Sequence, residues 1–437
     1  MFGVLRFAME RFQVLVVGGG PAGSAAAYAA AKAGVQVLLL ERGHEVGSKT
    51  VSGGLLYTHV LRDLYGDFWA EEDPPFERWI SRYVLGFLGD SSATLVDHYN
   101  TSFGEPPYNS VSVLRNKLDK WLAQKAQEAG AMIVTGTRVD DLLEENGRVK
   151  GIISGGDQIE ADVTVVCDGI NSLLTKKKGF RSEWAGSTLG IGVKQVIELP
   201  TGKLEERFLL SGLEGVEYTF LGRPKGVEGG AFLYTNKQSL SLGVILNMQS
   251  AVENNLDISM VTEDFKSHPF IEKLIAEGTL VEYSACLVAE GGLDMVPRLF
   301  GDGFLVAGSA AGFVLNNGFN LRGMDFAVGS GRIAGEVAAK AVKTGDTSSR
   351  VLGEYTHLLE NSFVLKHLRR YKNYPKFFAN RRLYDAYPEV INSFLHEMYS
   401  VDGGDRGHLL SVLRRNLEGK ASLYSLIKDA WDAARNL

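Results

Sequence analysis

Apolar and polar positions alternate in blocks at the start of the chain. Residues 12–17 (FQVLVV) are apolar except for Gln13, typical of a strand that is covered on both faces. An alanine-rich run over 24–33 predicts a helix, and Gly34 follows it where a helix end favours glycine. Residues 35–41 form a second apolar run. These blocks predict a strand–helix–strand unit of a parallel sheet.

The pattern changes after this unit. Residues 114–129 predict an amphipathic helix, and strand-like runs with turns fill 131–167, where Asn146-Gly147 is a strong hairpin signal. A second, mostly antiparallel sheet is expected from strands at 188–198, 205–210, 216–222, 230–235 and 240–247. Later segments predict a buried strand within 304–312, a long helix over 323–343 and a charged helical region over 351–437.

A glycine motif connects the first strand to the first helix. Gly18, Gly20 and Gly23 have the spacing that lets a backbone approach a pyrophosphate, and a helix N-terminus offers free N–H groups there. Glu41 ends the second strand, where a carboxylate can accept a hydrogen bond from a ribose 2′-hydroxyl. The motif predicts dinucleotide binding, and a purely structural turn is the alternative.

Three more segments favour a flavin over a nicotinamide. Arg115 begins the amphipathic helix and is suited to clamp a phosphate. Asp168-Gly169 follows a strand, and a helix begins near Gly323 after a glycine-rich loop, where its N–H groups could face a flavin. Taken singly, Arg115 has a solvated-charge alternative and Asp168-Gly169 a plain-turn alternative.

Composition excludes several other classes of protein. The 437 residues hold 46 Lys and Arg against 52 Asp and Glu, so no basic surface dominates and nucleic acid is not an expected partner. Cys167 and Cys286 form no CxxC pair, so a cysteine-rich zinc site and a self-contained iron–sulfur cluster are not expected. Both cysteines are expected to be buried. The eight histidines show no ligand spacing, and no metal site is predicted.

The motif set resembles the glutathione-reductase-like flavoproteins, which include the p-hydroxybenzoate hydroxylase and geranylgeranyl reductase groups. It consists of GGGPAG (18–23), Glu41-Arg42, Arg115, CDGINS (167–172), AGSAAG (307–312) and RGMD (322–325). Within that superfamily the chain resembles FixC and the electron transfer flavoprotein:quinone oxidoreductases along essentially its whole length. The segments that carry this closer resemblance are 47–57, 114–131, 229–236, 268–270, 290–299 and 362–371.

The resemblance implies an α/β fold, α+β overall, with a Rossmann-like FAD-binding domain, an inserted antiparallel-sheet domain and a C-terminal helical region. The implied boundaries are 11–187 and 284–345 for the two parts of the FAD-binding domain, 188–283 for the substrate or quinone domain, and 346–437 for partner docking.

The resemblance also implies non-covalent FAD, which itself carries the redox chemistry; no catalytic residue is assigned. Gly18, Gly20, Gly23 and Arg115 would hold the pyrophosphate, Glu41 the ribose, and Val139 the adenine. Asp168, Gly169 and Ser309 would line the chain to the flavin, with Ser309 where the superfamily has Asp. The ring would be bracketed by Val51, Ser52, Gly53, Gly54, Arg322, Gly323 and Met324. The other implied cofactor-binding residues are Pro21, Ala22, Arg42 and Gly308.

The implied activity is electron transfer from an electron transfer flavoprotein to a quinone. Because the four cluster cysteines of the single-chain enzymes are missing, the iron–sulfur cluster is expected on a separate ferredoxin-like subunit of a hetero-oligomer. Two alternatives remain open: a stand-alone FAD-dependent reductase or hydroxylase of the geranylgeranyl reductase or p-hydroxybenzoate hydroxylase type, and a non-enzymatic scaffold with structural FAD.

Two surfaces are candidates for partners. Residues 362–384 hold seven Lys and Arg, six aromatic residues and no acid, which favours docking of an acidic ferredoxin-like protein or anionic lipid over nucleic-acid binding, with a solvated helical face and core aromatics as the open alternative. Candidate quinone-entrance residues, with a plain core as the alternative, are Phe68, Trp69, Phe76, Trp79, Tyr83, Phe87 and Leu88. The first ten residues do not resemble a signal peptide. With no transmembrane pattern either, the chain is expected in the cytoplasm, peripheral on the inner face of the cell membrane.

Overall fold

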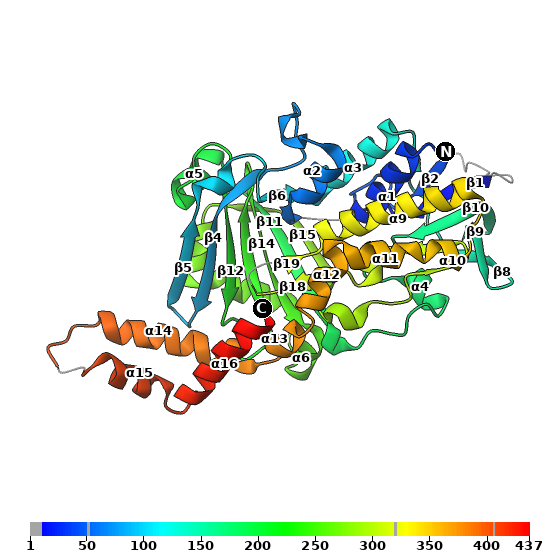
Figure 1. The fold of residues 1–437 in the computed structure, drawn as a ribbon. Helices are drawn as coiled ribbons and strands as arrows, with labels where there is room; N and C mark the ends of the chain where they lie inside the picture. The colour runs from blue at the N-terminus through cyan, green and yellow to red at the C-terminus, as the bar shows by residue number, and fades with distance from the viewer. Residues whose placement is uncertain (1–10, 50–52, 319–320, 405–406) are drawn as a thin grey trace.

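Two β-sheets organise the chain, with helices on their outer faces (Figure 1). The computed structural model describes residues 11–49, 53–318, 321–404 and 407–437. In Figure 1 the two sheets stand at opposite sides of the view, α14 lies below the ends of β4 and β5, and α15 lies farther from both sheets. The architecture confirms the expected α/β fold with a C-terminal helical region.

The first sheet is built around a parallel core, because β1 pairs in parallel with β10 on one side and β2 on the other. Its order is β16-β17-β10-β1-β2-β7, with the β8–β9 hairpin attached to β10. The strands are β1 (Arg11–Val17), β2 (Val37–Leu40), β7 (Met132–Val134), β8 (Asp141–Glu145), β9 (Arg148–Ser154), β10 (Asp157–Val166), β16 (Phe300–Gly301) and β17 (Phe304–Val306). The predicted strand–helix–strand unit is confirmed.

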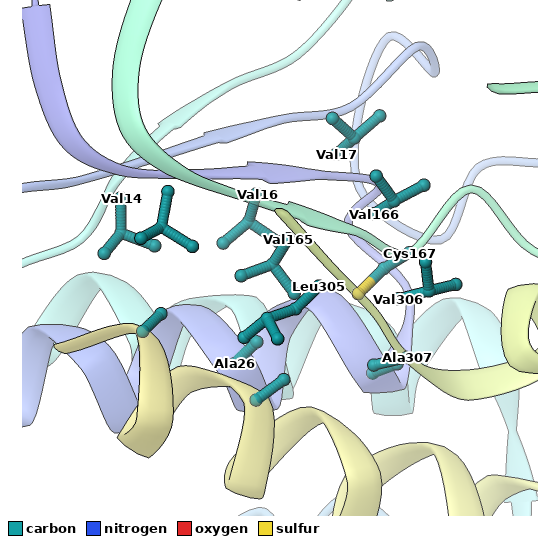
Figure 2. Close-up of a cluster of buried hydrophobic side chains, with 14 of the residues drawn as sticks. Val14, Val16, Val17, Ala26, Val165, Val166, Cys167, Leu305, Val306 and Ala307 are labelled. Atoms are coloured by element: carbon teal, nitrogen blue, oxygen red, sulfur yellow. The ribbon is translucent and has the colours of Figure 1, made fainter. Parts of the chain in front are cut away.

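Apolar side chains cover this sheet on both faces. Figure 2 shows Val14, Val16, Val165 and Leu305 on the face of the sheet that packs against the helices, among them the helix that contains Ala26. All five are fully buried, which explains why the strands are apolar at successive positions.

Two helices meet on this sheet without space for side chains between them. A Cβ added at Gly331 would lie 2.1 Å from the Ala22 carbonyl oxygen, and one at Gly335 would lie 2.2 Å from that of Ala26. Gly331 and Gly335 belong to α9 (Met324–Thr344), and the alanines to α1 (Pro21–Lys32). The glycines of α9 therefore set how closely it approaches the helix that follows the glycine motif.

The second sheet has the order β15-β11-β14-β13-β12-β4-β6-β3, with β5 on β4. Its described pairs are antiparallel except β4–β12, which is parallel. The strands are β3 (Gly53–Tyr57), β4 (Arg78–Leu88), β5 (Ala93–Tyr99), β6 (Ser110–Leu114), β11 (Leu189–Glu198), β12 (Glu214–Leu221), β13 (Gly229–Thr235), β14 (Ser239–Asn247) and β15 (Thr279–Ala289). Four strands come from 53–114, which the expected 188–283 insertion does not include, and the domain boundaries stay a prediction.

The strand expected at 205–210 is wrong, because residues 201–208 form helix α5 (Thr201–Phe208). Leu204 and Phe208 lie one helical turn apart and are both buried, so the apolar spacing there follows a helix. The prediction that both cysteines are buried is also wrong. Cys167 is buried, but Cys286 is exposed on β15, which ends the sheet order and pairs with β11.

The remaining helices connect and cover the sheets. They are α2 (His59–Tyr65), α3 (Arg115–Glu128), α4 (Leu173–Lys177), α6 (Met248–Glu253), α7 (Ile258–Ser267), α8 (Pro269–Ile275), α10 (Ser349–Leu352), α11 (Glu354–Asn361), α12 (Phe363–Arg370), α13 (Tyr374–Phe378), α14 (Ala386–Tyr399), α15 (Leu409–Leu417) and α16 (Leu423–Asn436). A short hairpin, β18 (Leu315–Asn316) and β19 (Leu321–Arg322), precedes α9. No helix in the described part of the chain has the length and apolar content needed to cross a membrane.

Candidate functional site

The N-terminus of α1 is open toward a possible ligand. Gly20 is its N-cap, no side chain caps the helix, and its first turn carries no acid. A Cβ added at Gly20 would have one protein group within 4 Å, the Arg115 Nη2 atom at 3.8 Å. The uncapped helix end and the guanidinium together favour an anion such as a pyrophosphate.

The other residues of the motif shape this turn. Gly18 has a φ of +100°, and a Cβ there would lie 2.4 Å from the Cys167 carbonyl oxygen. A Cβ at Gly23 would lie 1.8 Å from the Gly18 carbonyl oxygen. Pro21 occupies the first turn of α1, where its missing N–H costs nothing, and Ala22 packs against Gly308, whose own Cβ would lie 2.6 Å from that of Ala22.

Arg115 is held by a buried carboxylate. Its Nε and Nη2 atoms donate to the two oxygens of Asp119, each at 2.8 Å, and Asp119 is 1% exposed. Burial raises the pKa of Asp119, and the Arg115 charge opposes that shift. The solvated-charge alternative for Arg115 is therefore wrong, and the guanidinium is positioned beside Gly20.

Glu41 is fixed at the carboxyl end of β2. Its Oε2 accepts from the Gly19 N–H at 2.9 Å and its Oε1 from the Gly43 N–H at 2.6 Å. Each oxygen keeps a lone pair that a ribose hydroxyl could use. Arg42 is exposed, and Val139 lies in the connection between β7 and β8 rather than at a strand end.

Asp168 has one unpaired oxygen. It follows β10, and its Oδ2 accepts from the Leu174 N–H at 3.0 Å. Its Oδ1 is buried and lacks a hydrogen-bond partner among the described residues, and burial raises the pKa of this carboxyl. Gly169 has a φ of +79°, which confirms the sharp turn, and Ser309 is partly buried in the turn after β17. A hydroxyl-bearing cofactor chain would satisfy the Asp168 oxygen.

Of the residues expected at the flavin ring, Val51 and Ser52 lie outside the described residues. A Cβ at Gly53 would overlap the Val113 carbonyl oxygen, so glycine lets β3 reach β6. A Cβ at Gly54 would lie 3.5 Å from the Met324 Cε atom. The structure thus brings 53–54 together with the start of α9, whose N-cap Gly323 has no side-chain cap.

Arg322 points into a charged cluster that the sequence analysis missed. Its Nε donates to Asp325 at 2.7 Å, its Nη1 lies 2.9 Å from His367 Nδ1, and its Nη2 lies 3.4 Å from His59 Nε2. Asp325 is 1% exposed, and burial lowers the pKa of His367. The two histidines belong to α2 and α12, which are distant from Arg322 in sequence, so no local residue spacing could predict the cluster.

A cavity of about 630 Å³ lies on one face of the second sheet, between strands β12–β14 and the C-terminal region. Successive residues of β12 point to opposite faces of the sheet. Glu217, Thr219 and Leu221 line the cavity, while the residues between them pack into the core under α5, α7 and α8. Those core residues are Val216, Tyr218 and Phe220. The predicted quinone-entrance residues (Phe68, Trp69, Phe76, Trp79, Tyr83, Phe87 and Leu88) are not among the residues that line it.

Carboxyl groups mark two parts of this cavity. Burial raises the pKa of Glu217 to about 7. Burial, with a contribution from Glu228, raises the pKa of Glu290 to about 7 as well. Glu290 lies over Gly190 of β11, three strands away from β12 in the sheet order, a separation of about 14 Å at the usual strand spacing. Among the described residues no group of three or more His, Cys, Asp or Glu side chains forms a metal site.

Two family models match the chain. A model described as FAD dependent oxidoreductase matches residues 13–176, which contain the α1 N-terminus, Glu41, Arg115 and Asp168. A model described as the ETF-QO/FixC family C-terminal domain matches residues 374–437, from α13 to α16.

Similar proteins cover nearly the whole chain. Protein FixC of Escherichia coli O157:H7 is 41% identical over 96% of this chain and 97% of its own length. The probable electron transfer flavoprotein-quinone oxidoreductase of Escherichia coli K12 is 38% identical over 98% of this chain and 99% of its own. The structure of a geranylgeranyl bacteriochlorophyll reductase-like protein from Thermoplasma acidophilum has a TM-score of 0.72 at 20% identity, covering 98% of this chain and 100% of that one.

Proposed function

Because the chain belongs to the family of FixC and the electron transfer flavoprotein:quinone oxidoreductases, and is an FAD-dependent oxidoreductase, we propose that it takes electrons from an electron transfer flavoprotein and passes them to a quinone. The observation that carries this proposal is the adjacency of two sites. The Arg322 guanidinium lies 5.3 Å from the ring centre of Tyr57, and Tyr57 lines the cavity.

FAD is the electron carrier in this proposal and supplies the redox chemistry when it is bound. The N-terminus of α1 and Arg115 hold its pyrophosphate, Glu41 its ribose, and Asp168 a hydroxyl of the linking chain. Gly54 and Met324 lie beside the ring. The support is the open Gly20 turn and the unpaired Asp168 oxygen, both of which suit a phosphate-bridged ligand that carries hydroxyl groups.

The quinone binds in the cavity. A volume of about 630 Å³ is in the usual range for a small-molecule site, and the lining combines apolar side chains with many polar and charged ones. Leu55, Phe232 and Ile245 supply apolar surface for a quinone ring. This placement replaces the entrance near residues 68–88, where Phe68 and Phe76 are buried in a separate core cluster.

The iron–sulfur station arrives on a separate ferredoxin-like subunit, which makes the working assembly a hetero-oligomer peripheral to the inner face of the membrane. The C-terminal region offers the docking surface. Arg369, Arg370 and Lys372 are exposed. On α16, Tyr424, Ile427 and Trp431 are 77%, 69% and 64% exposed, so the C-terminal region presents apolar as well as basic side chains to solvent.

The test is reconstitution. The FAD-loaded chain is mixed with a reduced electron transfer flavoprotein, a ferredoxin-like subunit and a water-soluble quinone, and flavin absorbance and quinone loss are followed. Quinone reduction that needs the flavoprotein supports the proposal. Turnover of an isoprenoid or aromatic substrate with NAD(P)H by the chain alone would favour the stand-alone enzyme, and a flavin that dithionite cannot reversibly reduce would favour the scaffold.

A further inference from the structure

Glu217 is an unusual residue for its position in the fold. It is 6% exposed, it lines the cavity, and its described hydrogen bond comes from Thr219, whose hydroxyl donates to Oε1 at 2.5 Å. No Lys, Arg or His within the described ranges forms an ion pair with it. A buried carboxyl without a cation is costly when ionised, so burial favours the protonated form and raises the pKa of Glu217 to about 7.

Several side chains that carry hydroxyl groups lie near Glu217. Tyr234 on β13 and Tyr83 on β4 stand directly opposite Glu217 in the sheet register. Tyr57 is the third tyrosine near it, and the charge of Glu217 contributes to raising the pKa of all three phenols. Beyond Tyr57 lie Arg322 and Asp325 of the charged cluster.

Glu217 also stands between the cavity and a path of polar groups to solvent. Tyr83 is not among the residues that line the cavity, and it lies beside Glu217 on the neighbouring strand β4. Its hydroxyl lies 2.6 Å from the Ser110 Oγ and accepts from the Asn109 Nδ2 at 2.9 Å. Asn109 is exposed. Tyr83 therefore connects the sheet position beside Glu217 with an exposed residue outside the cavity lining.

We propose that Glu217 is the proton donor to a quinone bound in this cavity, and that Tyr83, whose hydroxyl is hydrogen-bonded to Ser110 and to the exposed Asn109, returns the proton from solvent. This inference rests on the proposed function. A quinone takes up two electrons and two protons to become a hydroquinone. Bound FAD, in its anionic two-electron-reduced state, would supply both electrons and one proton and return to oxidised FAD. The other proton comes from Glu217, whose carboxyl O–H bond breaks as a hydroquinone O–H bond forms, and the carboxylate then recovers a proton through Tyr83.

The first test reads the protonation of Glu217 without any turnover. Infrared spectra of the FAD-loaded wild-type protein are compared with those of Glu217→Gln across pH 5 to 9. A carboxylic acid carbonyl band that disappears as the pH rises through about 7, and that is missing from Glu217→Gln, is expected. The band should persist to higher pH in Thr219→Val, because the Thr219 hydrogen bond lowers the pKa of Glu217. Identical bands in wild type and Glu217→Gln would overturn the proposal.

The second test separates one turnover from many. The reduced, FAD-loaded protein is mixed with a water-soluble quinone, and flavin reoxidation is timed. Glu217→Gln should slow the first turnover about 100-fold, as expected for loss of a general acid. Tyr83→Phe should leave the first turnover near the wild-type rate and slow the following ones. Glu214→Gln, on the same strand but outside the cavity, is the matched control.

The outcomes distinguish the two proposals. If the wild-type protein is not reoxidised by any quinone, the proposed function fails. If wild type and Glu217→Gln are reoxidised at the same rate and with the same pH profile, quinone reduction stands and the role of Glu217 is overturned.

Discussion

Gly20 is the residue at which the backbone leaves space for a ligand. Gly20→Val should abolish FAD binding while the fold persists, because Gly20 has a φ of −70° and a new side chain would meet no protein atom closer than Arg115. Flavin content and circular dichroism measure the two effects. Gly202→Val, on α5 with nothing within 4 Å, is the control. Stoichiometric flavin in the Gly20 variant would contradict the site.

Arg115 has two roles that one substitution cannot separate. Arg115→Ala should weaken FAD by about 1.5–3 kcal/mol through loss of a charged hydrogen bond, and it also leaves the buried Asp119 without its cation. Adding Asp119→Asn should restore thermal stability but not affinity. Flavin titration and melting curves of the single and double variants check this. Recovery of wild-type affinity in the double variant would remove Arg115 from the phosphate site.

Local spacing allowed some of these residues to be predicted, and long-range packing hid others. The strand–turn–helix context of Gly20 and the strand end at Glu41 could be predicted because the residues that define them are close in sequence. The pairing of Arg322 with His59 and His367 depends on helices that meet only in the folded chain. Exposure of Cys286 depends on β15 lying at the sheet edge, which its own sequence does not reveal.

The contact between α1 and α9 gives a prediction at the level of helices. Gly335→Ala should destabilise the protein by about 1–3 kcal/mol, because the new methyl group would overlap the Ala26 carbonyl oxygen in a packed core. FAD affinity should fall as well, since α1 carries the phosphate-binding end. Chemical denaturation measures the change in the free energy of unfolding. Glu336→Ala, at an exposed position of the same helix, is the control. Equal stabilities would mean that the two helices separate without cost.

The cavity face of the second sheet should make stability depend on pH. Glu217 has a pKa of about 7 when folded and an ordinary value of 4.5. Between these values the folded chain keeps a proton that the unfolded chain releases, so the free energy of unfolding falls as pH rises. The loss is about 3 kcal/mol and is complete above the folded pKa. Denaturation of wild type and Glu217→Gln at pH 4.5 and 8 should show a smaller loss in the variant.

Strands were harder to predict than helices for a physical reason. The 205–210 segment has apolar residues that suit either structure, and the helical spacing of Leu204 and Phe208 decides only once they are buried together. The strands between 53 and 114 pair with one another and join the rest of the second sheet only through β4 and the distant β12, so local patterning did not reveal that they belong to it. The cavity was equally hidden, because it needs β12, β13 and the C-terminal region in place at once.

For the whole molecule, the basic C-terminal segment predicts how partners meet. Reversing Arg369, Arg370 and Lys372 to Glu should leave FAD content intact and slow electron transfer with a ferredoxin-like subunit, most strongly at low salt. Stopped-flow kinetics over a range of ionic strength measure this. The same reversal at Lys120, Lys150 and Lys273, exposed on α3, β9 and α8, keeps the net charge equal. If both triple variants behave alike, the docking site lies elsewhere.

The parallel pairing of β4 with β12 has a consequence during synthesis on the ribosome. β12 begins roughly 130 residues after β4 ends, so at 5–20 residues per second β4 waits about 6 to 25 s for that neighbour. Its antiparallel partners β5 and β6 emerge almost at once. The nascent chain therefore exposes one unpaired strand edge throughout this interval, and a chaperone that covers such edges would raise the yield of folded protein.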